Sequence, residues 1–93
     1  MANLSLEEIL YQIEQLCRKY YVEHLYLFGS YATGTETETS DIDIIIKGGK
    51  DITSLREEID EIPTLKKIDI FEYDRCRNIH LKEDMDKYGR KIY

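Results

Sequence analysis

Apolar residues recur along the chain first at helical and then at strand spacing. Ser5 and Glu8 have the spacing of a capping box. They introduce a set of apolar residues that lie on one face of a helix: Leu6, Ile9, Leu10, Ile13, Leu16, Cys17 and Tyr20. This pattern predicts an amphipathic helix over residues 5–20. The run His24–Phe28 is apolar and aromatic and stops at Gly29-Ser30, which predicts a buried strand that enters a tight turn.

The middle of the chain alternates between a polar loop and apolar strands. Residues 35–40 are polar and offer no face for packing, so they predict a surface loop. Residues 41–46 alternate and then become continuously apolar, as in a strand that has one end at the surface and the other in the core. Residues 47–50 predict a turn, and the alternation over residues 66–73 predicts a third strand.

Two more helices are indicated by their end signals. Ser54 and Glu57 stand in the register of a second capping box, and Pro63 ends the apolar helical pattern that follows. Asn78 can cap a last helix, for which Gly89 is placed as the C-terminal stop. We therefore expect one helix between the second and third strands and another near the C-terminus.

The order of these elements predicts an α+β fold with a small mixed β-sheet and helices packed on one face. The tail at residues 90–93 fits a final short strand. With 93 residues, the chain is expected to form a single domain over residues 1–93.

Composition and charge restrict the possible partners. The chain is 42% hydrophobic and 34% charged, which is typical of a folded globular protein. Its net charge of −6 is the opposite of what duplex nucleic-acid binding requires, so we expect none. No apolar run approaches the roughly 20 residues of a membrane span, and no signal-peptide pattern is present, so we expect a cytoplasmic protein without membrane contact. Cys17 and Cys76 lack the spacing of a zinc site or a disulfide framework.

Three carboxylates are the candidate chemical groups. Asp41 and Asp43 lie two apart on a predicted strand, so their side chains share a face, with Cα atoms roughly 6.5–7 Å apart. Asp69 lies in the third strand and can face the same side if that strand pairs with the second. Carboxylates that converge in this way repel one another, and a divalent cation would relieve the repulsion.

The carboxylates and the Gly29-Ser30 turn together suggest phosphoryl chemistry. Oxygen ligands favour Mg²⁺ or Mn²⁺, and two such ions can clamp the attacking and leaving oxygens at phosphorus. A glycine lets backbone N–H groups approach a phosphate, and Ser30 can add its hydroxyl. Each feature alone is common in exposed strands and turns. The Gly-Ser and Asp-x-Asp pair at one fixed spacing arises by chance in roughly one chain in a thousand of this composition.

At these residues the sequence resembles the minimal nucleotidyltransferases of the DNA polymerase β superfamily, which are encoded beside HEPN-domain partners. The matching segments are residues 27–34, residues 40–44, residues 68–70 and the last helix ending in Gly89. The resemblance implies a polymerase β-like nucleotidyltransferase fold. It also implies transfer of a nucleoside monophosphate, usually AMP from ATP, to an acceptor hydroxyl with two Mg²⁺ ions as cofactors.

The resemblance also assigns roles to residues and a partner. Asp41 and Asp43 would be ligands of both metal ions, and Asp69 would bind the catalytic ion and help to deprotonate the acceptor. Gly29 and Ser30 would contact the triphosphate. In similar systems the nucleotidyltransferase is the antitoxin of a hetero-oligomer, and it silences a HEPN-type RNase toxin by adenylylating a tyrosine or by binding alone.

Thr33 departs from the family pattern, because a basic residue is common at its position. Its neutral side chain places a phosphate or acceptor contact in doubt. The main alternative is therefore a non-catalytic antitoxin or scaffold that neutralises its partner by binding. Transfer to a small molecule such as an aminoglycoside is a third hypothesis, weakened by the absence of room for a domain that holds such a substrate.

Overall fold

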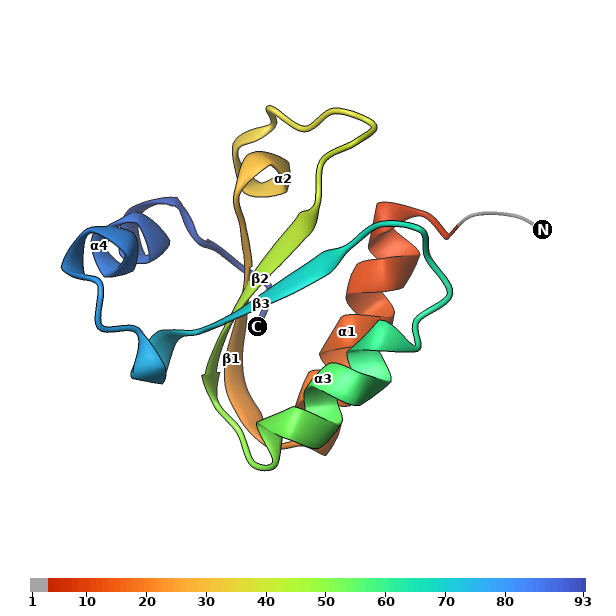
Figure 1. Cartoon of the computed structure of the whole chain (residues 1–93), viewed down its shortest axis with the longest axis horizontal. Coiled ribbons are helices and arrows are strands. Elements are labelled where there is room, and N and C mark those ends of the chain that lie inside the picture. Colours follow the sequence, from red (N-terminus) through yellow and green to blue (C-terminus); the bar gives the residue numbers. More distant parts are fainter. Residues whose placement is uncertain (1–3) are drawn as a thin grey trace.

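Four strands and four α-helices make up the computed structural model, which describes residues 4–93 (Figure 1). In chain order the elements are α1 (Leu6–Lys19), β1 (Val22–Phe28), α2 (Ser30–Thr33), β2 (Ile42–Gly48), α3 (Ile52–Asp60), β3 (Ile68–Glu72), a 3-10 turn (Tyr73–Arg75), α4 (Ile79–Tyr88) and β4 (Arg90–Lys91). The strand order is β3-β2-β1-β4. β1 is antiparallel to β2 and β4, whereas β2 and β3 are parallel, so the predicted α+β fold with a mixed sheet is confirmed.

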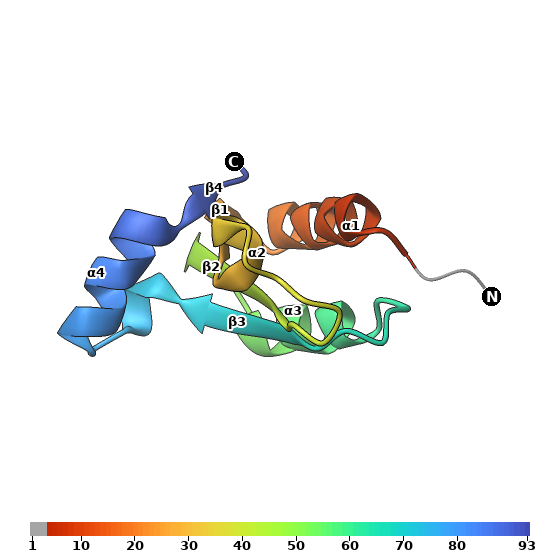
Figure 2. The ribbon, with the colours of Figure 1, turned by 90° about the horizontal axis from the view of Figure 1, so that it is seen from above.

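The main core lies between one face of the sheet and the helices α1 and α3 (Figures 1 and 2). Because side chains alternate along a strand, Ile42, Ile44 and Ile46 of β2 all point to this face. They pack with buried residues from α1, β1 and α3, namely Ile9, Ile13, Cys17, Val22, Leu25, Leu27, Leu55 and Ile59. Within the described range 4–93, no helix combines the length and the apolar character that a membrane crossing requires.

The last helix packs apart from α1 and α3. Strand alternation turns Ile45 to the opposite face of the sheet, where Met85 of α4 is buried beside it. Gly89 ends α4 as predicted, and its backbone lies close to this contact. A Cβ at Gly89 would lie 2.5 Å from the carbonyl oxygen of Met85 and 3.3 Å from Cδ1 of Ile45. The sheet is thus covered by α1 and α3 on one face and by α4 at one end of the other, so the prediction that the helices pack on one face is wrong for α4 (Figure 2).

Local hydrogen bonds confirm the first helix and correct the start of the second. Ser5 accepts a hydrogen bond from the backbone N–H of Glu8 at 3.1 Å, and the reciprocal half of the capping box is also present. By contrast, the predicted capping box at Ser54 is wrong. The helix α3 begins at Ile52, and its N-cap is Asp51, whose carboxylate accepts from the N–H of Ser54 at 3.4 Å.

The two other strands of the sheet differ from their predicted bounds at the ends. β1 begins two residues earlier than the predicted run, and β3 is shorter than residues 66–73 because the chain enters a 3-10 turn at Tyr73. The final strand is confirmed. It is held to β1 by hydrogen bonds from Ile92 N–H to the Leu25 carbonyl at 2.8 Å and from Leu25 N–H to the Tyr93 carbonyl at 3.0 Å.

Replacing Asp51 by alanine is expected to destabilise the protein by about 1–2 kcal/mol. The change removes the N-cap of α3 and leaves an alanine at φ 51°, in the left-handed region. Asp51→Asn keeps both the cap and the backbone preference and should change the free energy of unfolding little. Ser54→Ala, at the cap position that the sequence suggested, should also have little effect. Urea unfolding of the three variants measures the difference, and a larger loss for Ser54→Ala would contradict the observed cap.

Candidate active site

Asp43 and Asp69 are brought together by the pairing of β2 with β3. The parallel ladder places Asp43 opposite Asp69, while the antiparallel ladder places Phe28 of β1 opposite Asp43. Ile42 and Ile44 point into the core, so the intervening Asp43 points to the other face of the sheet. The sequence predicted this convergence on the condition that the third strand pairs with the second, and the structure satisfies the condition.

The carboxylates of Asp43 and Asp69 repel each other. The pKa of Asp43 is raised from 3.8 to about 6, first by burial and then by the negative charge of Asp69 and a hydrogen bond with it. The charge of Asp41 contributes in the same direction, and the ammonium of Lys67 acts against it. The Asp43 carboxyl therefore holds negative charge less readily than a solvated carboxylate does.

Asp41 occupies a different position from the one predicted. β2 begins at Ile42, so Asp41 precedes the strand and is exposed, although its charge is felt by Asp43. Among residues 4–93, no three Asp, Glu, His or Cys side chains are arranged so that they could hold a metal ion. The structure thus brings together Asp43 and Asp69, two of the three predicted carboxylates, whereas Asp41 lies outside the strand.

The carboxylates of Asp43 and Asp69 are suitable ligands for a divalent cation. Carboxylate oxygens are preferred by Mg²⁺ and Mn²⁺, and a cation between Asp43 and Asp69 would offset the repulsion that, together with burial, raises the pKa of Asp43. Asp43 and Asp69 would hold the ion. Asp41 is the other acid whose negative charge acts on Asp43. The metal-binding role of all three remains a prediction.

The Gly29-Ser30 turn lies directly against Asp43. Gly29 has φ 70° and ψ −152°, a conformation that only glycine adopts readily, and α2 begins at the next residue. A Cβ at Gly29 would clash with Oδ2 of Asp43 and lie 3.2 Å from its carboxyl carbon. The predicted phosphate-binding turn and the predicted metal ligand are therefore adjacent in space, even though they lie 14 positions apart in the chain.

Thr33 has no charge to offer this site, and its hydroxyl is already engaged. It lies 3.0 Å from the hydroxyl of Thr35 and donates weakly to the carbonyl oxygens of Gly29 and Ser30, both at 3.4 Å. The nearest cation to the carboxylates is instead Lys67, whose ammonium lies 3.5 Å from Oδ1 of Asp69. Lys67 was not among the residues predicted for the site, although its place two residues before Asp69 in the alternating pattern of residues 66–73 is the signal that reveals it.

Two aromatic rings also lie beside the carboxylates. Phe28 and Phe71 meet edge to face with their ring centroids 5.8 Å apart. Phe28 pairs with Asp43 across the ladder, and Phe71 follows Asp69 by two residues, so these four side chains share one face of the sheet. An apolar surface therefore adjoins the acidic pair.

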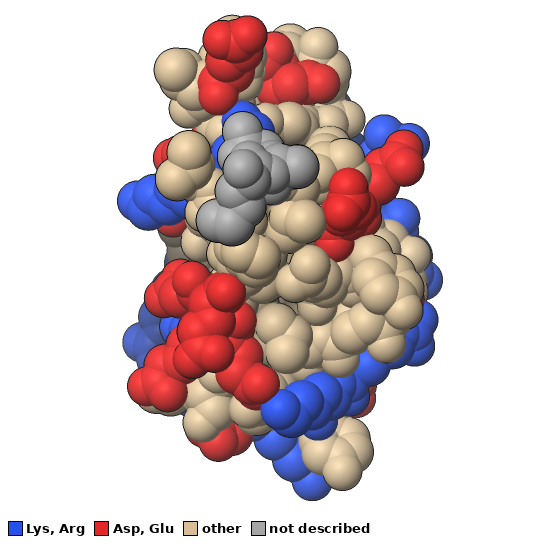
Figure 3. Space-filling model, turned by 90° about the vertical axis from the view of Figure 1, so that its right-hand side faces the viewer, with Lys and Arg blue, Asp and Glu red and all other residues tan. Residues whose placement is uncertain are grey.

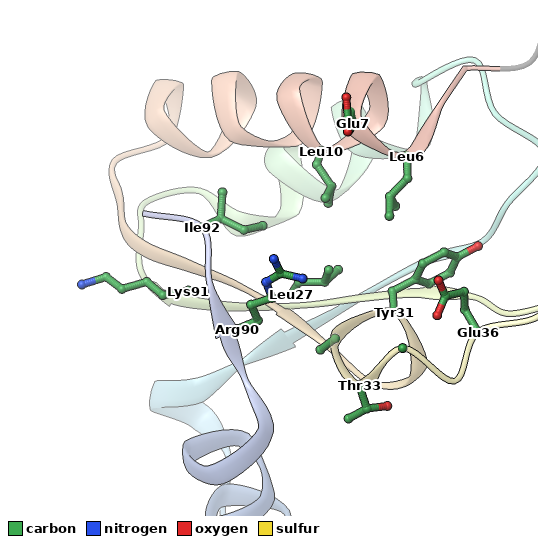
Figure 4. Close-up of a pocket in the computed structure, with 12 residues that line it drawn as sticks. Leu6, Glu7, Leu10, Leu27, Tyr31, Thr33, Glu36, Arg90, Lys91 and Ile92 are labelled. Atoms are coloured by element: carbon green, nitrogen blue, oxygen red, sulfur yellow. The ribbon is translucent and has the colours of Figure 1, made fainter.

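A cavity of about 660 Å³ lies on the other side of α2 (Figure 4). It is open between α1, α2 and the edge strand β4, and its apolar wall includes Leu6, Leu10 and Leu27. Leu27 points into the core face of the sheet, whereas Asp43 and Asp69 point away from it. The cavity is thus separate from the carboxylate pair.

Comparison with known proteins links the chain to nucleotide transfer. The family described as "Polymerase beta, Nucleotidyltransferase" matches residues 11–93. Two relatives come from Methanocaldococcus jannaschii. "Putative protein adenylyltransferase MJ0435" is 33% identical over 75% of this chain and 80% of its own length. "Putative protein adenylyltransferase MJ1379" is 41% identical over 73% of this chain and 71% of its own length.

Solved structures with a similar fold come from toxin–antitoxin complexes. A chain from a toxin–antitoxin crystal structure with AMP-PNP aligns with a TM-score of 0.73 and 23% identity, over 89% of this chain and 71% of that one. A chain from a mutant MntA-HpeT toxin–antitoxin complex aligns with a TM-score of 0.71 and 19% identity, over 89% and 70% of the two chains. These similarities establish the fold.

Proposed function

The chain belongs to the polymerase β nucleotidyltransferase family, and from this premise we propose that it transfers AMP from ATP to a hydroxyl group of a partner protein. The acceptor is proposed to be a tyrosine of a HEPN-type RNase toxin, so that the chain acts as the antitoxin. The relatives named as protein adenylyltransferases support a protein acceptor. The toxin–antitoxin complexes with the same fold support the antitoxin assignment.

The carboxylate pair beside the Gly29-Ser30 turn is the observation that carries this proposal. Asp43 and Asp69 face each other across the parallel ladder, and the Gly29 backbone lies against the Asp43 carboxylate. A triphosphate on the turn would place its α-phosphorus beside the two acids. When two Mg²⁺ ions are bound, they supply the positive charge that the phosphates and carboxylates require.

The proposed reaction is an in-line displacement at the α-phosphorus. The acceptor oxygen forms a bond to phosphorus as the bond from phosphorus to the bridging oxygen of the β-phosphate breaks, and pyrophosphate leaves. Asp69 helps to remove the hydroxyl proton, which its carboxylate can accept. Gly29 and Ser30 hold the triphosphate through the backbone and the serine hydroxyl, and so orient the leaving group.

The surface supports a protein partner. Tyr11 and Leu65 are 64% and 94% exposed, although both are large apolar residues. On the side of the molecule where α1 and α3 lie, acidic and basic side chains surround an uncharged middle region (Figure 3). A surface of this kind favours contact with a protein over contact with a nucleic-acid duplex. We therefore propose a hetero-oligomer of the chain with its toxin.

Transfer to the partner should depend on Asp69. The two proteins are mixed with Mg²⁺ and ATP, separated under denaturing conditions, and weighed by intact mass spectrometry. We expect the partner to gain one or more AMP units, and we expect Asp69→Asn to lower the rate by about 100-fold or more, because it removes a charged group at the reacting centre. Asp60→Asn makes the same chemical change at an exposed position on α3 and should leave the rate unchanged.

Neutralisation by binding alone is the second candidate function. Two observations favour it: the neutral Thr33 in α2, and the lack of a three-acid metal group among the described residues. The same experiment separates the two functions. A catalyst leaves the toxin modified after separation, whereas a scaffold leaves it unmodified and active again.

A further inference from the structure

Lys67 is held at the edge of the carboxylate pair by the sheet. Its carbonyl accepts a hydrogen bond from the N–H of Ile42 at 2.8 Å, so its backbone is tied to the start of β2 directly before β3 begins. It lies one residue before β3 and two residues before Asp69. Its ammonium lies 3.5 Å from Oδ1 of Asp69, which places a positive charge directly at the proposed reacting centre.

The ion pair between Lys67 and Asp69 is loose. Its length exceeds the roughly 2.7–2.9 Å of a strong charge-assisted hydrogen bond. The Lys67 side chain is 72% exposed, so water screens the attraction and the ammonium can turn to another anion at little cost. The neighbouring Lys66 is committed elsewhere, because its ammonium donates to the carbonyl oxygen of Glu38 at 3.0 Å.

A triphosphate at this site needs a cation that the α2 turn does not supply. Asp43 and Asp69 already repel each other, and Lys67 is the one cation that counteracts the raised pKa of Asp43 within the described part of the chain. Thr33 presents a neutral hydroxyl that is bound to its own helix. A nucleotide on Gly29-Ser30 would therefore meet two carboxylates and one nearby positive charge, that of the exposed Lys67.

We propose that Lys67 binds the triphosphate of the nucleotide and supplies the positive charge that Thr33 lacks. The ammonium then reaches an oxygen of the β- or γ-phosphate, while the Lys67 carbonyl stays hydrogen-bonded to Ile42 of β2. This proposal rests on the proposed nucleotidyltransferase function and adds a substrate-binding residue to it. Lysine suits this position because it binds phosphate as a point charge and needs no fixed geometry.

The test is a calorimetric titration with α,β-methylene-ATP and Mg²⁺, since the chain cannot cleave this analogue. We expect Lys67→Met to weaken binding about tenfold, and we expect Lys67→Arg to retain most of the affinity because it keeps the charge. Lys87→Met removes the same charge from an exposed position on α4 and should bind like the natural chain. AMP, which lacks the β- and γ-phosphates, should bind the Lys67→Met chain and the natural chain equally well.

The outcomes distinguish this inference from the proposed function. Equal affinity of the natural chain and Lys67→Met for the analogue would overturn the binding role of Lys67. An equal loss of affinity for AMP and for the analogue would also overturn it, since that result indicates a structural change and not a lost phosphate contact. Failure of the natural chain to bind either nucleotide would instead overturn the proposed function, and the role of Lys67 with it.

Discussion

Replacing Asp43 by asparagine is expected to lower nucleotide transfer by about 100-fold or more while it stabilises the metal-free protein by about 1 kcal/mol. Activity falls because the charged oxygen closest to both Asp69 and the Gly29 turn is lost. Stability rises because the raised pKa of Asp43 means that the folded chain holds this negative charge less readily than the unfolded chain does. The asparagine amide can instead donate a hydrogen bond to the Asp69 carboxylate.

The expected gain is smaller than the pKa shift alone implies, because much of the Asp43 carboxyl remains in contact with water, which screens the repulsion. In a domain of this size, about 1 kcal/mol corresponds to a rise of about 4–8 °C in the Tm measured without metal at neutral pH. Asp41→Asn makes the same change at the exposed residue that precedes β2, and its Tm should stay nearly constant. A fall in Tm for Asp43→Asn would contradict the electrostatic repulsion between Asp43 and Asp69. Full transfer activity of this variant would exclude Asp43 from the chemical step.

Replacing Gly29 by alanine is expected to destabilise the fold by about 3 kcal/mol. The added methyl would clash with Oδ2 of Asp43, and the backbone at φ 70° and ψ −152° is strained for any residue with a Cβ. The carboxylate would have to move, and with it the contact between the turn and the carboxylate pair. A loss of this size should lower the Tm by about 12–24 °C in a thermal unfolding experiment.

Gly34 provides a matched control, because it also has a positive φ, 75°, and ends the same short helix. A Cβ at Gly34 would meet no atom within 4 Å, so Gly34→Ala should lose only about 1 kcal/mol through its left-handed backbone. The difference between the two variants measures the contact with Asp43 together with the greater backbone strain at ψ −152°. Equal losses would indicate that backbone strain alone explains Gly29 and that the carboxylate can move aside freely.

Much of the fold follows from local patterns. The Ser5 capping box, the alternation of β2 and β3 and the Gly89 stop each involve residues within a few positions of one another, so the sequence was sufficient to predict them. The cap of α3 was predicted wrongly because Asp51 and Ser54 are both acceptable caps locally. Distant contacts decide between them: Lys50 N–H donates to the Tyr20 carbonyl at 2.7 Å, which fixes the turn before α3.

For the candidate site, the sequence by itself determined which groups are present: the carboxylates, the glycine turn and the neutral Thr33. Alternation also determined that the Asp43 side chain points to the face of the sheet opposite to that of Ile42 and Ile44, since successive side chains of a strand point to alternate faces. The tertiary structure decided which groups meet. Only the parallel register pairs Asp43 with Asp69, only the packing of the turn places Gly29 against that carboxylate, and only the fold leaves Asp41 outside the strand. These relations depend on strand pairing between residues far apart in the chain, which no local pattern specifies.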